Sequence, residues 1–458
     1  MTGKLNCFKA YDIRGRVPED LNEELAYSLG RAYAVHVRPD GPVAVGRDVR
    51  ETSATLANTL IRGLNDGGVN TRDIGLCGTE MVYFAAGRAG MGGGIMVTAS
   101  HNPMAYNGFK LVRADAVPIS GDSGLNDLEE RVRTQNLGTK ADKPGTNQSE
   151  DIARDYTAKV VSFVDPSKLK PLRIVANAGN GCAGPFLDRV AKHLPFEFIR
   201  IHHEPDGTFP NGIPNPLLEE NQPATANAVR EHRADLGVAW DGDFDRCFFF
   251  DETGAFADGY YIVGLLAKRI LKDYPGAKII HDPRMTWNTI ATVNEAGGTP
   301  IQWKTGHAFM KEKMRAEDAA YGGEMSAHHY FRDFTYCDSG MIPWLLIAAL
   351  ICETGKPLSR MVEEGRRRFP GSGEINSEVD DPDGVIETIR AAYADSATKQ
   401  EQVDGLSMEF GDQWRFNVRK SQTEPILRLN VETAGDERLL KEKTQELLTT
   451  IRTLNTEH

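Results

Sequence analysis

The sequence predicts a loop-rich α/β protein with three or four domains, and three observations support this. Its 458 residues exceed the size at which a single hydrophobic core keeps growing. A hydrophobic content of 40% with 45 glycines suits an α/β enzyme that has ample core and many turns. One theme also recurs along the chain: an expected strand ends in a turn that carries chemistry, at Ser100, at Asp241 and at Gly323-Glu324.

The first of these turns follows Gly92-Gly93-Gly94-Ile95-Met96-Val97, which is typical of a flexible turn that leads into a short buried strand. Asn102-Pro103 breaks the strand, so Ser100 is displayed at its end. A serine hydroxyl needs a neighbour that accepts its proton, and His101 and Lys110 are the nearby candidates. An ordinary polar turn explains these residues about equally well, because adjacent side chains point apart on extended backbone.

A second turn, Asp241-Gly242-Asp243-Phe244-Asp245-Arg246, lies between the apolar runs Leu236–Trp240 and Cys247–Phe250, which predict strands. Its three carboxylates would repel one another in a half-buried loop unless a cation neutralised them. A calcium EF-hand loop begins with the same letters, but Arg246 stands where that loop requires glycine. Magnesium fits better, because it takes few carboxylates and keeps a position for water or a phosphate oxygen.

A third cluster near the C-terminus, Arg419-Lys420-Ser421-Gln422-Thr423-Glu424-Pro425, combines a guanidinium with two hydroxyls. Arginine binds phosphate bidentately, and hydroxyls or backbone amides complete the shell. Alone the cluster is a weak signal, because such residues are usually solvated. Together, a displayed serine, a magnesium-type loop and a phosphate-binding loop are the parts that phosphoryl transfer requires.

The order of these motifs carries a family resemblance. Ser-His-Asn-Pro at 100–103, Asp-Gly-Asp-x-Asp-Arg at 241–246, Gly-Glu-Met-Ser at 323–326 and Arg-x-Ser-x-Thr-Glu-Pro at 419–425 resemble the alpha-D-phosphohexomutase superfamily nearly from end to end. Phe8–Gly15, Pro205–Pro210 and Lys304–His307 also resemble family segments in the expected order. Gly323–Phe331 is similar to the sugar-binding loop of bacterial phosphomannomutases, which supply GDP-mannose synthesis. Gln422 departs from the family, which usually has asparagine there.

The resemblance implies a four-domain, heart-shaped molecule with three similar α/β domains and a smaller C-terminal α+β domain. Composition breaks predict domain boundaries at 1–148, 149–252, 253–369 and 370–458. The elements expected at or near these breaks are a surface linker at Thr134–Glu150, a strand at Leu172–Ala176, a helix at Tyr260–Leu271 and a hinge at Gly371–Gly384.

The resemblance also implies an isomerase that interconverts mannose 6-phosphate and mannose 1-phosphate through phosphorylated Ser100 and a bisphosphorylated hexose. Mg²⁺ would be held by Ser100, Asp241, Asp243 and Asp245, and a hexose 1,6-bisphosphate would be the activator. Candidate acid–base residues are His101, Lys110 and Arg14. The residues expected to bind the hexose or its phosphates are Tyr11, Arg246, Arg284, His307, Glu324, Ser326, His328, Arg419, Ser421, Gln422 and Thr423. Of the pair His328-His329, only the first is expected to face the sugar.

Three alternatives bear on this function. A serine hydrolase is disfavoured, because no Gly-x-Ser-x-Gly elbow surrounds Ser100. A non-catalytic sugar-phosphate sensor would have lost the serine or a carboxylate, and all four are present. The closest competitor is a dual phosphomannomutase/phosphoglucomutase, because a site that accepts a sugar in two orientations is poorly placed to reject its C2 epimer.

Charge and composition limit the partners. The net charge of −12, from 53 basic and 65 acidic residues, argues against binding to nucleic acid or anionic membranes. A sugar bisphosphate therefore requires a local reversal of the field, which is expected from Arg14, Lys110, Arg246, Arg284 and Arg419 in one cleft. No apolar run approaches a membrane span and the N-terminus lacks the pattern of a signal peptide, so a cytoplasmic protein is expected. The expected oligomeric state is a monomer or a weak homodimer. Six scattered cysteines predict buried, reduced thiols.

Overall fold

The computed structural model describes residues 5–421 and 426–456. The chain forms two compact units. The first comprises residues 1–256, 306–316 and 327–355, and the second comprises 257–305, 317–326 and 356–458. The segment between residues 257 and 355 therefore contributes to both units.

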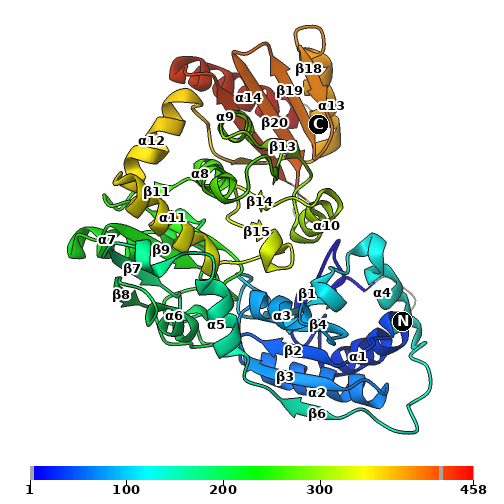
Figure 1. Cartoon of the computed structure of the whole chain (residues 1–458). Helices are drawn as coiled ribbons and strands as arrows, with labels where there is room; N and C mark the ends of the chain where they lie inside the picture. The colour runs from blue at the N-terminus through cyan, green and yellow to red at the C-terminus, as the bar shows by residue number, and fades with distance from the viewer. Residues whose placement is uncertain (1–4, 422–425, 457–458) are drawn as a thin grey trace. The chain divides into compact units, whose positions relative to one another are not determined.

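The first unit begins with a six-stranded sheet in the order β1-β5-β4-β2-β3-β6 (Figure 1). Its strands are β1 (Ile13–Arg16), β2 (Val43–Arg47), β3 (Thr71–Leu76), β4 (Gly93–Val97), β5 (Tyr106–Arg113) and β6 (Asn147–Ser149), and its helices are α1 (Glu23–Val37), α2 (Ser53–Asp66), α3 (Thr79–Ala86) and α4 (Leu125–Thr134). Strand β5 runs antiparallel to both neighbours, whereas β2 is parallel to β3 and β4. Strand β4 is apolar and buried throughout, and β2 is apolar and buried from Val43 to Gly46, as is typical of strands covered on both faces.

The second sheet of this unit has the order β11-β10-β9-β7-β8. Its strands are β7 (Arg173–Asn177), β8 (Glu197–Ile201), β9 (Leu236–Trp240), β10 (Cys247–Phe250) and β11 (Phe256–Ala257), with helices α5 (Ala153–Val161), α6 (Ala183–Ala191) and α7 (Pro223–His232). Strands β9 and β10 pair antiparallel, with Trp240 opposite Cys247. The loop Asp241–Arg246 is therefore the tip of a buried hairpin.

The remaining elements of the first unit are α10 (His307–Glu317), β15 (His329–Phe331), β16 (Cys337–Asp338) and α11 (Met341–Thr354). Helix α11 is buried from Met341 to Cys352, and it packs against β10 and α5. In the described part of the chain, no single helix is long and apolar enough to span a membrane. Helix α11 and the following α12 (Leu358–Arg368) are together long and apolar enough, but the pair is bent by 93°.

The second unit contains a parallel group of strands in which β12 (Lys278–His281) pairs with β13 (Thr299–Gln302) and with β14 (Tyr321–Gly323). Helices α8 (Gly259–Asp273), α9 (Trp287–Glu295) and α12 belong to the same unit. Helix α8 begins after Asp258, whose side chain accepts a hydrogen bond from the Tyr260 amide and so caps the helix.

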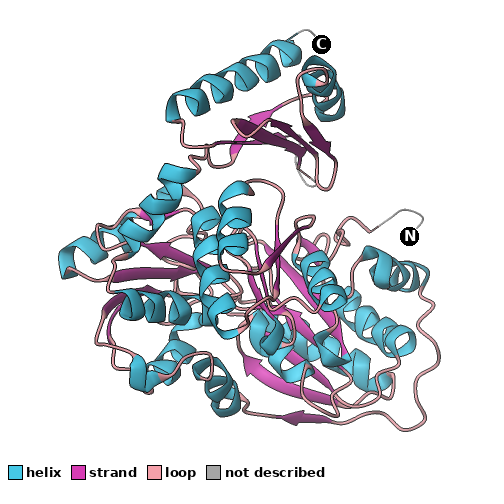
Figure 2. Ribbon diagram, turned by 45° about the horizontal axis from the view of Figure 1, so that its top comes forward, coloured by secondary structure: helices cyan, strands magenta, loops and turns pink. Residues whose placement is uncertain are grey.

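The chain ends in an antiparallel sheet of order β17-β21-β20-β19-β18. Its strands are β17 (Ile375–Glu378), β18 (Lys399–Glu401), β19 (Leu406–Phe410), β20 (Trp414–Lys420) and β21 (Ile426–Thr433). Helix α13 (Pro382–Tyr393) lies between β17 and β18 in the sequence, and α14 (Glu437–Thr456) follows β21. Figure 2 shows both helices against the same face of this sheet. Trp414, Phe416 and Val418 alternate along β20 and all point into that core.

Most predicted elements are confirmed. Strands β4, β7, β9 and β10 and helix α8 lie where apolar runs predicted them, and all six cysteines are buried and free. The predictions of a linker and of a hinge without regular structure were partly wrong. Thr134–Glu150 contains β6, which pairs with β3, and Gly371–Gly384 contains β17 and the start of α13. Both missed strands are short and partly polar, so pairing with a neighbour determines them more than their own propensity. The four domain boundaries stay a prediction.

Candidate active site

Ser100 lies in the turn after β4 with an unusual backbone. Its φ of 49° places a non-glycine residue in the left-handed region. The hydroxyl donates a hydrogen bond to Asp241 Oδ2 at 2.7 Å and lies 3.0 Å from His101 Nδ1. On extended backbone the side chains of residues 100 and 101 would diverge, and the left-handed conformation is what brings them together. Ser100 Oγ and His101 Nδ1 therefore face each other, although the two residues are adjacent in sequence.

Three carboxylates converge beside this hydroxyl. Asp241, Asp243 and Asp245 are all buried in the loop between β9 and β10, and one oxygen of each lies within 4.8 Å of the others. Gly242 permits the close approach, because a Cβ at this position would be 2.7 Å from the Ser100 carbonyl oxygen. The serine and the three aspartates, which the sequence analysis assigned to one site, thus lie together in the first unit.

Two cations partly neutralise these carboxylates. Lys110 Nζ pairs with Asp243 Oδ2 at 2.8 Å and with Asp245 Oδ2, and Arg246 Nε donates to Asp241 Oδ2 at 3.1 Å. Burial alone would lower the pKa of Lys110, but the charges of Asp243 and Asp245 outweigh it and raise the pKa. Lys110 therefore carries its proton across the neutral range.

The aspartates retain oxygens that these cations do not use. Among the described residues, Asp243 Oδ1 accepts no hydrogen bond, and Asp245 Oδ1 faces only His328 Nε2 at 3.6 Å, beyond hydrogen-bond length. A buried carboxylate oxygen without a partner is costly. Oxygen ligands of this kind are those that a hard divalent cation prefers, so the three side chains fit such an ion.

Arg14 and His101 complete the surroundings of Ser100. Arg14 Nη1 donates to the Ala99 carbonyl at 2.9 Å and to Asn102 Oδ1 at 2.5 Å, and its Nε lies 3.1 Å from Asp12. Burial, and next the nearby Arg246 guanidinium, lower the pKa of His101 well below its ordinary value. A neutral imidazole beside the serine can accept a proton.

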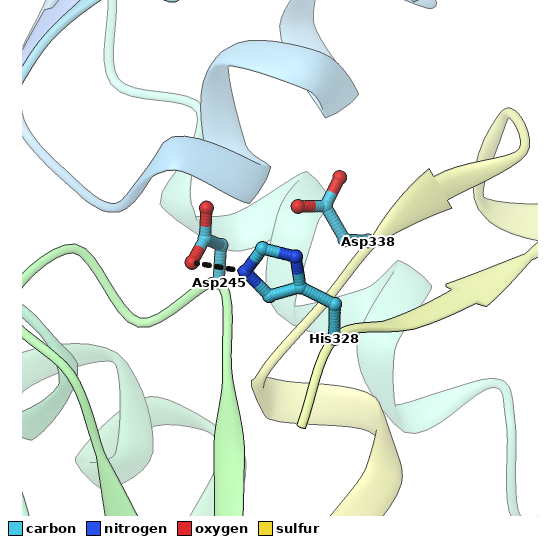
Figure 3. Close-up of side chains that lie close together, drawn as sticks. All are labelled: Asp245, His328 and Asp338. Atoms are coloured by element: carbon cyan, nitrogen blue, oxygen red, sulfur yellow. Dashed lines mark ion pairs between the residues drawn. The ribbon is translucent and has the colours of Figure 1, made fainter. Parts of the chain in front are cut away.

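Histidines from two later segments of the chain belong to the same unit. The Tyr11 ring meets the His307 ring edge-on, with centroids 4.8 Å apart. Figure 3 shows His328 between Asp245 and Asp338. His329, in β15, is fully buried, whereas His328 is partly exposed. His329 is therefore the core member of the pair, and the expectation that His328 faces the sugar stays a prediction.

The second unit groups another part of the predicted site. Arg284 Nη2 donates to Asp282 Oδ2 at 2.7 Å and to Ser326 Oγ at 3.3 Å. The same Asp282 oxygen accepts the Met325 amide at 2.8 Å, which fixes the loop after β14 that carries the buried Glu324. Sequence reasoning placed Arg284 and Ser326 in one site but did not identify the aspartate that joins them.

The phosphate-binding cluster at the end of β20 is described only in part. Arg419 Nη2 lies 3.2 Å from Glu374 Oε2, and Arg284 and Arg428 pair with the same carboxylate at 3.5 and 3.0 Å. The Ser421 amide donates to the Ile426 carbonyl at 2.9 Å. The predicted ligands Gln422 and Thr423 lie outside the described residues.

Several polar or charged residues of these clusters were missed from the sequence. They are Thr79, whose hydroxyl donates to Asp243 at 2.5 Å; Lys311 and Asp338, which pair at 2.7 Å; and Glu374, which receives three arginines. The available signal was weak in each case. Asp338 lies three residues before the apolar run that forms α11, and nothing in the sequence near it indicated Lys311 as its partner.

Comparison with known families agrees with this geometry. Family models described as phosphoglucomutase/phosphomannomutase match the chain in four parts: alpha/beta/alpha domain I at residues 5–138, domain II at 154–254, domain III at 258–369 and the C-terminal domain at 374–449. The chain belongs to the phosphoglucomutase/phosphomannomutase family. The predicted fold class, three α/β domains followed by a C-terminal α+β domain, is thereby confirmed.

Relatives within the family cover almost the whole chain. A phosphomannomutase of Salmonella montevideo is 55% identical over 450 residues, which is 97% of this chain and 98% of the relative. A protein of Xanthomonas campestris pv. campestris (strain B100) named phosphohexose mutases is 56% identical over 448 residues, or 98% and 99% of the two chains. The crystal structure of a phosphoglucomutase/phosphomannomutase family protein from Burkholderia thailandensis has a TM-score of 0.87 and 32% identity, covering 98% of this chain and 97% of that one.

Proposed function

We propose that this family member is a phosphomannomutase that interconverts mannose 6-phosphate and mannose 1-phosphate through a phosphoserine at Ser100. The observation that carries the proposal is the Ser100 hydroxyl, held 2.7 Å from Asp241 within three buried carboxylates. Full-length relatives named phosphomannomutase, at 51 to 55% identity, support mannose as the sugar. Supply of GDP-mannose synthesis by a cytoplasmic monomer or weak homodimer belongs to the same proposal.

Each transfer exchanges one phosphorus–oxygen bond for another. The bond from phosphorus to Ser100 Oγ breaks as a hexose hydroxyl oxygen bonds to phosphorus. The hexose hydroxyl gives its proton to a base, and Ser100 Oγ takes up a proton and leaves as a hydroxyl. Neutral His101 is the base candidate closest to Ser100, and the charged Lys110 and Arg14 are placed to stabilise negative oxygens. In the return step, the second phosphate of the bisphosphorylated hexose restores phosphorylated Ser100.

A divalent cation, proposed to be Mg²⁺, would be held by Asp241, Asp243, Asp245 and a phosphate oxygen on Ser100, and would neutralise charge on the transferring group. Glu324, Ser326 and Arg284 are proposed to bind the hexose, and Arg419, Ser421, Gln422 and Thr423 the phosphate that is not reacting. Tyr11, Arg246, His307 and His328 are proposed as further substrate-binding residues. A hexose 1,6-bisphosphate would act as the activator that phosphorylates Ser100.

A dual phosphomannomutase/phosphoglucomutase is the second candidate. The relatives from Xanthomonas campestris, at 56% identity, carry the broader name phosphohexose mutases. Mannose and glucose differ only at C2, and one such difference changes transition-state binding modestly unless the site forms a hydrogen bond that depends on it.

Coupled kinetics on mannose 1-phosphate and glucose 1-phosphate, each with its hexose 1,6-bisphosphate, distinguish the two candidates. A phosphomannomutase is expected to have a kcat/KM for the mannose substrate at least ~10-fold higher. Equal values would establish the dual enzyme. Absence of turnover with both sugars would contradict the proposed function.

Replacement of Ser100 by alanine tests the covalent step. The Ser100→Ala protein is expected to fold as wild type and to lose nearly all turnover, because it lacks the phosphoryl acceptor. Intact-protein mass spectrometry after incubation with the bisphosphate is expected to show one added phosphate on the wild type and none on the variant. Wild-type turnover by the variant would rule out a phosphoserine at this position.

A further inference from the structure

A buried guanidinium lies behind the Ser100 turn and binds four of its backbone carbonyls. Arg50 is 4% exposed. Its Nη2 donates to the carbonyls of Ser100 at 3.0 Å and Asn102 at 2.5 Å, and its Nη1 donates to those of Pro103 at 2.9 Å and Tyr106 at 3.0 Å. All the hydrogen-bonding capacity of its two terminal nitrogens is directed at this one turn.

The turn has little regular structure of its own to satisfy these carbonyls. Between β4 and β5, its internal backbone hydrogen bonds run from Asn102 N to Ala99 O at 2.9 Å and from Tyr106 N to Pro103 O at 3.0 Å. Buried carbonyls require donors, and arginine presents several N–H groups in one rigid plane. Lysine has the same charge but directs its donors from a single atom.

Asp48 anchors the guanidinium and extends the network to the other side of Ser100. One Asp48 oxygen lies 3.5 Å from Arg50 Nε and accepts the Thr98 hydroxyl at 2.7 Å. Thr98 Oγ1 in turn accepts the Ser100 amide at 2.9 Å. The amide of Ser100 is therefore held through Thr98 and Asp48, and its carbonyl is held directly by Arg50.

The hydrogen bonds to the Ser100 amide and to the Ser100 carbonyl hold the strained backbone of this residue in place. A non-glycine residue with a φ of 49° persists only where its surroundings determine the conformation. That conformation brings the hydroxyl to Asp241 and His101. Fixing both the N–H and the C=O of the peptide groups around Ser100 fixes the direction of the Cα–Cβ bond that carries the hydroxyl.

We propose that Arg50 is a positioning residue for phosphoryl transfer, and that it acts through the backbone of Ser100 without touching the substrate. This inference rests on the proposed function. Near-attack geometry is demanding, and a displacement of about 1 Å costs on the order of 100-fold in rate. A lysine at position 50 keeps the charge but cannot bind the four carbonyls at once, so the turn loses its single conformation.

The test compares Arg50→Lys with Arg31→Lys. Arg31 is a matched control, because it is also 4% exposed and donates to two loop carbonyls, Leu137 at 3.2 Å and Gly138 at 3.0 Å, away from the Ser100 turn. Arg50→Lys is expected to lower kcat by about 100-fold, with a KM within about 3-fold of wild type. Arg31→Lys is expected to keep wild-type kcat while lowering the melting temperature by a similar amount.

Hydrogen exchange and chemical rescue give readouts that a merely structural role would not move. The amides between residues 99 and 106 are expected to exchange faster in Arg50→Lys and at the wild-type rate in Arg31→Lys. Guanidinium at low millimolar concentration is expected to restore part of the turnover of Arg50→Ala, whereas urea, which is uncharged, is not.

Equal kcat values for Arg50→Lys and Arg31→Lys, or unchanged exchange between residues 99 and 106, would overturn the proposal. The exchange measurement requires no substrate, so it tests Arg50 even if wild type turns over neither hexose phosphate. In that case the proposed function fails, and the exchange result alone decides whether Arg50 positions the turn.

Discussion

Two buried carboxylates, Asp243 in the first unit and Glu432 in the second, share their burial and a cationic neighbour but differ in how their oxygens are used. Both are 0% exposed. Glu432 Oε1 accepts from Arg415 Nη1 and from the Thr286 amide, each at 2.6 Å. Its Oε2 accepts from the Trp287 amide at 3.1 Å and from the Tyr260 hydroxyl.

Asp243 is satisfied on one side only. Its Oδ2 accepts from Lys110 Nζ at 2.8 Å and from the Thr79 hydroxyl at 2.5 Å, while its Oδ1 has no hydrogen bond among the described residues. The contrast teaches that burial and charge do not by themselves distinguish the carboxylate proposed to bind a cation from the one that pairs within the fold. The distinguishing property is an acceptor that the fold leaves unused, and that property predicts opposite effects for mutation of the two residues.

The largest expected effect is on catalysis, at Asp243. Asp243→Asn keeps the volume of the side chain and removes one negative charge, so turnover is expected to fall at least ~1,000-fold with a melting temperature close to wild type. Thermal unfolding with and without Mg²⁺ checks the cause, because ligand binding stabilises the folded state. Wild type is expected to gain stability with Mg²⁺, and an equal gain in Asp243→Asn would break the comparison.

The next effect is on stability, at Glu432. Glu432→Gln leaves the Arg415 guanidinium, which is 1% exposed, without its counter-ion, so the free energy of unfolding is expected to fall by about 3 kcal/mol. Denaturant unfolding measures this change. The folded variant is expected to keep the Mg²⁺-dependent stabilisation of wild type, in contrast to Asp243→Asn.

Glu363→Gln is the matched control for that experiment. Glu363 lies on α12 and pairs with Arg367 at the surface, where such pairs contribute under about 1 kcal/mol. A loss at Glu432 no larger than the loss at Glu363 would show that the buried ion pair does not stabilise the fold.

A third buried carboxylate, Glu80 on α3, sharpens the comparison with the smallest effect. It accepts hydrogen bonds from Tyr156 Oη, Ser339 Oγ and the amides of Gly340 and Met341, but it has no ion pair among the described residues. Burial raises the pKa of Glu80 to about 8, although these donors lower it.

Because this pKa lies above the ordinary value of 4.5, the folded protein holds a proton that the unfolded chain releases between those two pH values. Raising the pH through that window therefore destabilises wild type, and Glu80→Gln removes this dependence. The melting temperature of wild type minus that of Glu80→Gln is expected to fall by a few degrees, roughly, from pH 5.5 to pH 8.5. A difference that stays constant across this range would contradict the raised pKa.

The sequence predicted best where a local pattern determines structure. The apolar runs on either side of Asp241–Arg246 predicted β9 and β10, because a buried hairpin needs continuous apolar residues, and repulsion among adjacent aspartates predicted a cation. The proximity of Ser100 and His101 was not predictable, because it depends on a left-handed residue that Arg50 holds from 50 positions away.

Long-range contacts set the same limit in the second unit. Tyr260 and Glu432 are 172 residues apart, and neither residue type signals the other. The short strands β6 and β17 were missed because pairing with β3 and β21, rather than their own composition, makes them strands. The roles of the site residues stay predictions, since geometry shows which side chains meet but not which of them moves a proton.

Helix α11 has a consequence for the order of synthesis. The second sheet is complete in sequence at Ala257, yet α11, which packs on β10 and brings Trp344 to within 5.7 Å of the Phe198 ring, begins only at Met341. At roughly 5–20 residues per second, a growing chain waits several seconds before it can cover that apolar face. A fragment that ends at Phe256 is therefore expected to aggregate, and the first unit becomes complete only when residues up to Gly355 have been made.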